Sequence, residues 1–77
     1  MTHLPVLSGR DLVKALAGLG YQRSHQRGSH IILRRNAQPH HRLTVPDHPV
    51  IAKGTFAAIA REMGMTAPEL AHYSSLV

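Results

Sequence analysis

The chain has 77 residues, so we expect one domain over residues 1–77 with a thin hydrophobic core. It contains no cysteine, which excludes disulfides and thiolate metal sites. Nine Lys+Arg residues against four Asp+Glu residues give a net charge of +5, and this balance favours a polyanionic partner such as nucleic acid. A basic surface that only serves solubility explains the same charge equally well.

The apolar runs are too short to span a bilayer, so we expect a cytoplasmic protein without membrane contact. Aromatic residues are few: Tyr21, Phe56 and Tyr73 are the three in the chain. Because binding of single strands usually uses a platform of aromatic side chains on which bases stack, this composition argues against that mode of binding.

Two stretches have apolar residues at helical spacing. The first begins after Ser8, whose hydroxyl is suited to cap it, and ends at Gly20. The second is expected to begin with Thr55 as its N-cap and to end at Gly64. A further capping box, Thr66-Ala67-Pro68-Glu69, predicts a short third helix that ends near residue 73.

Three strands are predicted between the two longer helices, over residues 21–25, 29–35 and 42–45. Gln26-Arg27-Gly28 is short enough to be a hairpin turn between the first two, and Pro46 ends the third because it cannot donate to a sheet ladder. The order predicts an α+β fold: a three-stranded antiparallel sheet, two helices packed on one face, and a short C-terminal helix.

Strand alternation predicts which side chains reach the open face of this sheet. Ile31 and Leu33 would face the helices, and so would the aliphatic side chains at 43 and 45. The opposite face would then carry His30, Arg34 and Arg42. We therefore expect a histidine among arginines on a surface that faces solvent.

The segment Gln26-Arg27-Gly28-Ser29-His30 holds the candidate chemistry. An imidazole can take a proton from a hydroxyl or return one to a leaving oxygen, which RNA cleavage requires. From its position alone, a surface histidine without a function is the simpler explanation of His30. Ser29 has no acid at the spacing of a catalytic triad, so it either orders the turn or binds a phosphate oxygen.

Basic residues lie around this segment and suit phosphate contacts that position RNA without reading its sequence. A solvated charged face is the alternative for any one of them. The RNA-binding candidates are Arg23, Arg27, Gly28, Ser29, Arg34, Arg42 and Lys53. His40, His41 and His48 have Asp47 as the only nearby carboxylate, so we expect no metal site there.

Taken in order, these motifs resemble the HicA (YcfA-like) family of toxins. The resemblance rests on Leu19-Gly20-Tyr21, then Gln26-Arg27-Gly28-Ser29-His30 entering an aliphatic strand, and then Val45-Pro46-x-His48. Lys53-Gly54-Thr55 then opens a helix that contains Ile59, Arg61 and Gly64, so the similarity extends from Leu7 nearly to the C-terminus.

The resemblance implies a double-stranded-RNA-binding-domain-like αβββα fold. It also implies an endoribonuclease (mRNA interferase) that needs no metal and no cofactor, the toxin of a type II toxin–antitoxin system, with His30 as the catalytic acid or base. The implied partners are an mRNA substrate and a HicB-type antitoxin that covers the basic face. Two alternatives stay open: a non-enzymatic RNA-binding module of the same fold, and a protein-binding module whose charge serves solubility.

Overall fold

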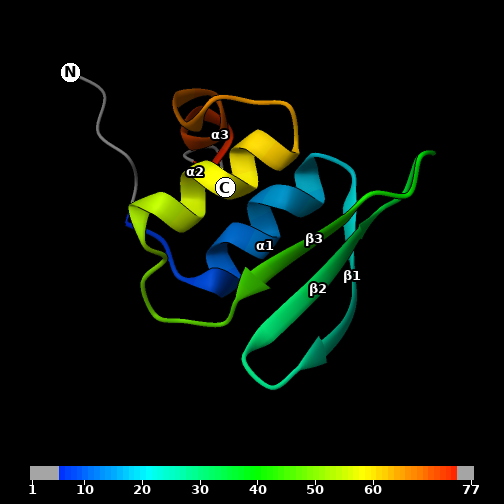
Figure 1. Ribbon diagram of the computed structural model, residues 1–77, viewed down its shortest axis with the longest axis horizontal. Coiled ribbons are helices and arrows are strands. Elements are labelled where there is room, and N and C mark those ends of the chain that lie inside the picture. The colour runs from blue at the N-terminus through cyan, green and yellow to red at the C-terminus, as the bar shows by residue number, and fades with distance from the viewer. Residues whose placement is uncertain (1–5, 75–77) are drawn as a thin grey trace.

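The computed structural model describes residues 6–74, in which one helix precedes three strands and two helices follow them (Figure 1). This is the predicted α+β order, and its layout is compatible with a double-stranded-RNA-binding-domain-like fold. The elements are α1 (Gly9–Gly18), β1 (Tyr21–Arg27), β2 (His30–Arg35), β3 (Arg42–Pro46), α2 (Lys53–Glu62) and α3 (Ala67–Ser74).

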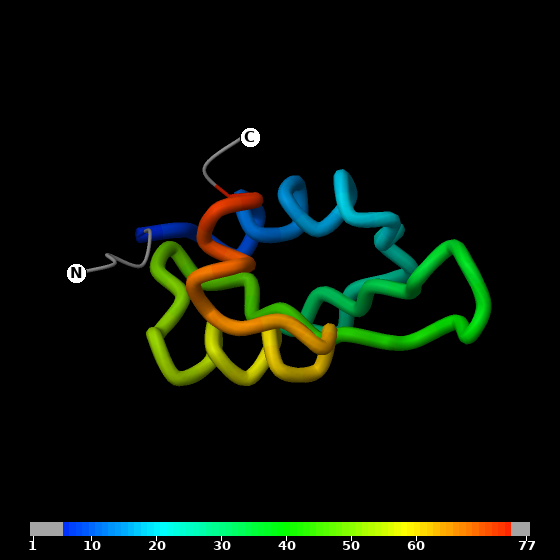
Figure 2. The backbone as a smooth tube through the Cα atoms, turned by 90° about the horizontal axis from the view of Figure 1, so that it is seen from above, coloured from blue at the N-terminus to red at the C-terminus, as the bar shows by residue number. Residues whose placement is uncertain are grey.

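The three strands form one antiparallel sheet in the order β1-β2-β3, with β2 at the centre. Helix α1 packs against β1 and β3, α2 packs against β3, and α3 contacts the other two helices. Figure 2 shows α3 between α1 and α2. The helices therefore bury one face of the sheet and leave the opposite face in solvent.

The core lies between the buried face of the sheet and the helices. In the sheet it contains Ile31, Leu33, Leu43 and Val45, each at most 1% exposed, as strand alternation predicted. The helices contribute a larger apolar set, in which Leu12, Leu16, Phe56, Ile59, Ala60 and Leu70 are buried. Because alternate strand residues point to opposite faces, this core directs His30, Arg34 and Arg42 outward.

The ends of the helices agree with the sequence prediction at three places and differ from it at one. The Asp11 N–H donates to the Ser8 hydroxyl at 3.1 Å, and Gly20 and Gly64 take φ values of +92° and +76° after their helices. The expectation of Thr55 as the N-cap of α2 is wrong. The Phe56 N–H donates to the Ala52 carbonyl at 2.9 Å, so α2 begins at Lys53 and Ala52 is the cap.

The turn between β1 and β2 is also tighter than the sequence prediction. It consists of Gly28 and Ser29 alone, because Arg27 at the end of β1 pairs directly with His30 at the start of β2. Gly28 has a φ of +59°, which a two-residue hairpin turn requires and glycine adopts without penalty. The register shifts once, at Ser24, so this residue forms a β-bulge in β1.

The predicted capping box at α3 is confirmed and has a consequence for stability in acid. The Thr66 N–H donates to the Glu69 carboxylate at 2.9 Å, and the Glu69 N–H donates to the Thr66 hydroxyl at 3.2 Å. Hydrogen bonding to Thr66 lowers the pKa of Glu69 below its ordinary value. The backbone of Thr66 has the larger effect, and the side chain of Thr66 has the smaller one. The folded state therefore favours the ionised carboxylate.

A Glu69→Gln variant should lose part of the acid dependence of folding stability. The Glu69 carboxylate stabilises the fold above its pKa in the unfolded chain, and this contribution is lost as pH falls through the lower pKa of the folded state. Urea midpoints measured from pH 6 to pH 3 should thus fall less steeply for the variant than for the wild type. An unchanged slope in the variant would contradict this role of the capping box.

Candidate nucleic-acid interface

The open face of the sheet, opposite the core, carries three rows of side chains from all three strands. Directly paired residues on neighbouring strands point to the same face, so the register defines each row. All are exposed except the half-buried Ile32 and Pro46. The open face consists of Arg27, His30 and Pro46, then His25, Ile32 and Thr44, then Gln22, Arg34 and Arg42.

Every formal charge on the open face is positive. None of its nine positions in the described chain carries a carboxylate, and Arg34 lies directly opposite Arg42. Like charges in directly opposed strand positions destabilise a sheet. Because an anion bound between the two guanidinium groups would relieve this repulsion, the face suits a phosphate-bearing ligand.

The turn that presents His30 is anchored to the rest of the fold. The Asp47 N–H donates to the Ser29 carbonyl at 2.6 Å, and the Gln26 side-chain amide donates to the Gly28 carbonyl at 3.0 Å and to the Asp47 carboxylate at 3.1 Å. Asp47 also pairs with Arg10 of α1, at 3.4 Å between Nε and Oδ1. The backbone carbonyls of Gly28 and Ser29 thus hold the turn in place and so fix the position of His30.

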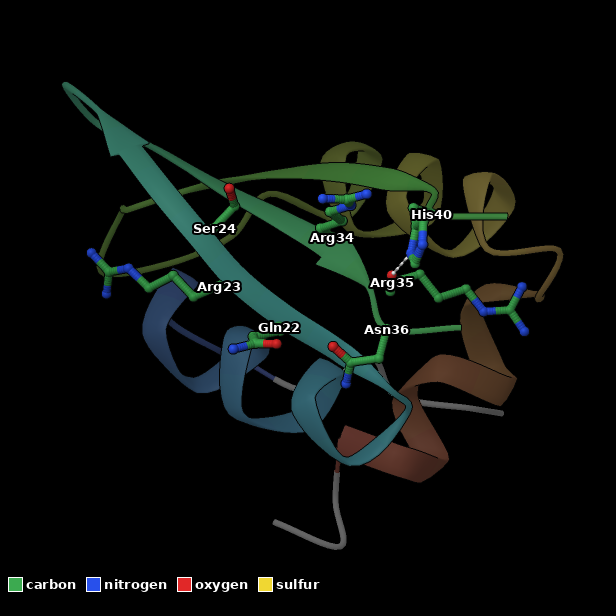
Figure 3. A pocket seen from close by; sticks show the side chains of 7 residues that line it. All are labelled: Gln22, Arg23, Ser24, Arg34, Arg35, Asn36 and His40. Atoms are coloured by element: carbon green, nitrogen blue, oxygen red, sulfur yellow. Dashed lines mark hydrogen bonds between the residues drawn. The ribbon is translucent and has the colours of Figure 1, made fainter. Parts of the chain in front are cut away.

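A polar cavity of about 350 Å³ lies at the other end of the open face (Figure 3). Three residues on its wall carry guanidinium groups, but the side chains of Arg23 and Arg35 extend away from its centre. The His40 ring is held by a hydrogen bond of 3.0 Å between its Nδ1 and the Arg35 carbonyl. The cavity is lined by Gln22, Arg23, Ser24, Arg34, Arg35, Asn36 and His40.

A second, more open cavity of about 640 Å³ lies between β3 and α2. Its wall includes both Arg61 and Glu62, so it offers charges of opposite sign side by side in the sequence. This mixed lining is less suited to a phosphate chain than the open face, where all the formal charges are positive.

Two of the predicted RNA-binding residues do not join the open face. Arg23 pairs with Leu33, which places it on the helix side at the β1 edge, and its guanidinium donates to the Gln26 side chain. Lys53 begins α2, beyond the loop that follows β3. The structure therefore gathers His30, Arg27, Arg34 and Arg42 on one surface and leaves these two cations outside it.

His25 is an open-face residue that the sequence analysis did not identify. It pairs with Ile32, and its ring Nδ1 lies 3.0 Å from the Ser24 hydroxyl. The length of the turn was the signal in the sequence that could have identified it. With Gly28 and Ser29 as a two-residue turn, Arg27 pairs with His30, and His25, two residues before Arg27, lies on the same face.

Residues 6–74 contain neither a cluster of metal-binding side chains nor a helix suited to a membrane. No group of three or more His, Cys, Asp or Glu side chains lies close enough together to hold a metal ion. Across the same residues, no helix has both the length and the apolar character needed to cross a membrane. His40, His41 and His48 thus form no metal cluster.

Comparison with known proteins identified one family. The family model described as the HicA toxin of bacterial toxin–antitoxin systems matches residues 9–65, which include α1, the whole sheet and α2. Neither the search of curated proteins nor the search of solved structures found a match. The match to the family thus includes every row of the open face.

Proposed function

The chain belongs to the HicA toxin family, and we propose that it is an endoribonuclease (mRNA interferase) whose catalytic residue is His30. The observation that carries this proposal is the position of His30: exposed, on a carboxylate-free face, directly opposite Arg27 and in the same strand as Arg34. An imidazole in this place can exchange a proton with a ribose hydroxyl or a leaving oxygen while the arginines hold the phosphates.

The reaction needs positive charge near the phosphorus as well as a proton acceptor. Arg27 is the nearest cation to His30 by sheet register, and its guanidinium would offset the charge that develops on the phosphate oxygens. Arg34 and Arg42 lie two rows further along β2 and β3 and would hold neighbouring phosphates. A face of this kind suits the phosphates and hydroxyls that A-form RNA presents across its shallow minor groove.

A toxin of this family implies an antitoxin partner, and we propose a HicB-type protein that covers the open face. Such a partner would neutralise the toxin by occupying the surface that RNA needs. The absence of carboxylates from the open face favours a partner that supplies acidic side chains there. Arg23, on the helix side at the β1 edge, and Lys53, at the start of α2, lie outside this surface and would make outer phosphate contacts.

Incubation of the purified chain with a defined mRNA tests the proposal. The wild type should produce discrete fragments in the presence of EDTA, because the proposed proton transfers need no metal. A non-enzymatic RNA-binding module would instead bind the mRNA in a salt-dependent manner without producing fragments. A protein-binding module would show negligible RNA affinity at physiological salt.

Removing the two opposed arginines should weaken RNA binding and its dependence on salt. An Arg34→Ala, Arg42→Ala double variant loses two phosphate contacts, so the affinity should fall at least roughly tenfold. The slope of log K against log salt should become shallower by about 1.4–1.8. Fluorescence anisotropy with a labelled RNA at several salt concentrations measures both quantities.

A second double variant with the same net charge serves as the control. Lys14→Ala and Arg61→Ala remove two exposed cations from α1 and α2, outside the open face. This variant should keep nearly the affinity and the slope of the wild type. Equal losses in the two double variants would show that only net charge matters and would remove the assigned role of Arg34 and Arg42.

A further inference from the structure

Cleavage of RNA without a metal moves two protons. One leaves the ribose 2′-hydroxyl as its oxygen attacks phosphorus, and another reaches the 5′-oxygen as the bond between phosphorus and that oxygen breaks. These oxygens lie on opposite sides of the phosphorus, so two groups at a suitable separation catalyse the step better than one. His30 supplies one such group under the proposed function.

The open face contains one other imidazole, that of His25. The guanidinium groups there are always protonated and cannot accept a proton. Because Arg27 pairs directly with His30, His25 is the diagonal cross-strand neighbour of His30 on the same face. Diagonal neighbours in an antiparallel pair lie about 7–8 Å apart, so two imidazole rings at these positions can approach one phosphate from two sides.

The β-bulge gives the His25 ring a defined orientation. Ser24 is the additional residue in β1, and its hydroxyl lies 3.0 Å from Nδ1 of His25. With Nδ1 engaged, Nε2 is the ring nitrogen left for a ligand on the open face. Bulges commonly re-aim side chains next to active sites, and this one places a hydroxyl beside the imidazole.

We propose that His25 is the second proton-transfer group of this RNase, acting with His30 on one phosphodiester; this rests on the proposed function. The neutral imidazole of one histidine takes the proton of the 2′-hydroxyl as the bond between O2′ and phosphorus forms. The imidazolium of the other gives its proton to O5′ as the bond between phosphorus and O5′ breaks. The products are a 2′,3′-cyclic phosphate and a 5′-hydroxyl, and proton exchange with water restores the pair.

The pH profile of cleavage is the readout that separates proton transfer from a structural role. The wild type should show a bell-shaped kcat/KM profile, whose two limbs belong to the pair of histidines. Both His25→Ala and His25→Gln should cleave a short RNA about 10²–10³-fold more slowly, lack one limb, and keep the RNA affinity of the wild type. Five neighbours on the open face could influence the pH at which the limb of His25 occurs: Gln22, Arg27, His30, Ile32 and Arg34.

A substrate with a better leaving group assigns the two roles. An RNA in which sulfur replaces the bridging 5′-oxygen needs little help from an acid, because a thiolate leaves readily. This substrate should restore cleavage by the variant that lacks the acid and should not restore cleavage by the variant that lacks the base. Rescue of one histidine variant and not the other is the expected pattern.

Failure of this inference is distinct from failure of the proposed function. If the wild type does not cleave RNA, or if His30→Ala cleaves as well as the wild type, the proposed function and this inference fail together. If His30→Ala is inactive while His25→Ala keeps a two-limbed profile and nearly full kcat, His25 is not the second group. A His25→Ala variant with raised KM and unchanged kcat would make it a binding residue and would equally overturn the inference.

Discussion

Replacing His30 with alanine is expected to lower the rate of RNA cleavage by about 10²–10⁴-fold, the usual contribution of a positioned acid or base. RNA affinity should stay close to that of the wild type, because Arg27, Arg34 and Arg42 keep their positions on the open face. His30 is exposed at the first position of β2, so truncating its side chain removes no buried contact. The substitution therefore separates chemistry from binding and from folding.

Gel analysis of a defined mRNA, with binding measured in parallel, checks this expectation. His72→Ala is the matched control, since it removes an imidazole from α3, which packs against α1 and α2. The control should cleave like the wild type, and circular dichroism should show the same fold in all three proteins. If His30→Ala cleaves and arrests growth as the wild type does, the catalytic assignment is wrong and the RNA-binding alternative gains support.

Replacing Gly9 with alanine should produce the largest loss of stability among single methyl additions to the glycines of the described chain. A Cβ at this position would lie 2.0 Å from the Pro46 carbonyl oxygen and 3.1 Å from the Asp47 Cα. Both atoms belong to the backbone, so the clash can be relieved only by moving α1 away from the end of β3. Overpacking of this kind costs about 1–3 kcal/mol or more.

The site should be affected together with stability. The Gly9 N–H donates to the His48 carbonyl at 2.9 Å. Asp47, the residue before His48, donates its N–H to the Ser29 carbonyl in the turn. Displacing this segment would loosen the turn that presents His30. Gly9→Ala should thus reduce cleavage even at temperatures where the protein stays folded. Chemical denaturation measures the loss of stability, and activity assays at low temperature measure the loss of cleavage.

Gly18→Ala is the control for this effect, because it adds the same methyl group to the same helix. A Cβ at Gly18 meets no atom within 4 Å. Since alanine is the better helix former, this variant should be as stable as the wild type or more stable, by about 0.5–1 kcal/mol. Equal destabilisation by the two variants would show that the contact between Gly9 and Pro46 does not limit the approach of α1 to β3.

The arrangement of the elements and the choice of buried face followed from local patterns. Apolar residues at helical spacing and alternation in the second and third strands predicted the α+β fold and the outward direction of His30, Arg34 and Arg42. The error at Thr55 arose because threonine is a good N-cap by type, whereas the cap of α2 is decided by the backbone of Ala52. Side-chain preference alone does not decide which of several neighbouring residues is the N-cap of a helix.

Strand register decided the rest of the site. The two-residue turn extends β1 to Arg27 and sets it opposite His30, and the bulge at Ser24 changes the pairing of every residue before it. These features place Arg23 on the helix side and His25 beside His30 on the open face. A one-residue difference in pairing moves a side chain to the other face, so the position of these two residues depended on the turn.

The sequence by itself determined which faces of the second and third strands and of the two longer helices are buried, and that His30 faces solvent, because both depend on short-range periodicity within one element. Only the tertiary structure decided which other side chains share the face with His30. That outcome depends on hydrogen-bonded pairing between strands and on Asp47, which follows β3 and is connected to the turn, β1 and α1 through bonds to Ser29, Gln26 and Arg10. Contacts between residues as distant in the chain as 10 and 47 arise only when the helix and the sheet pack together.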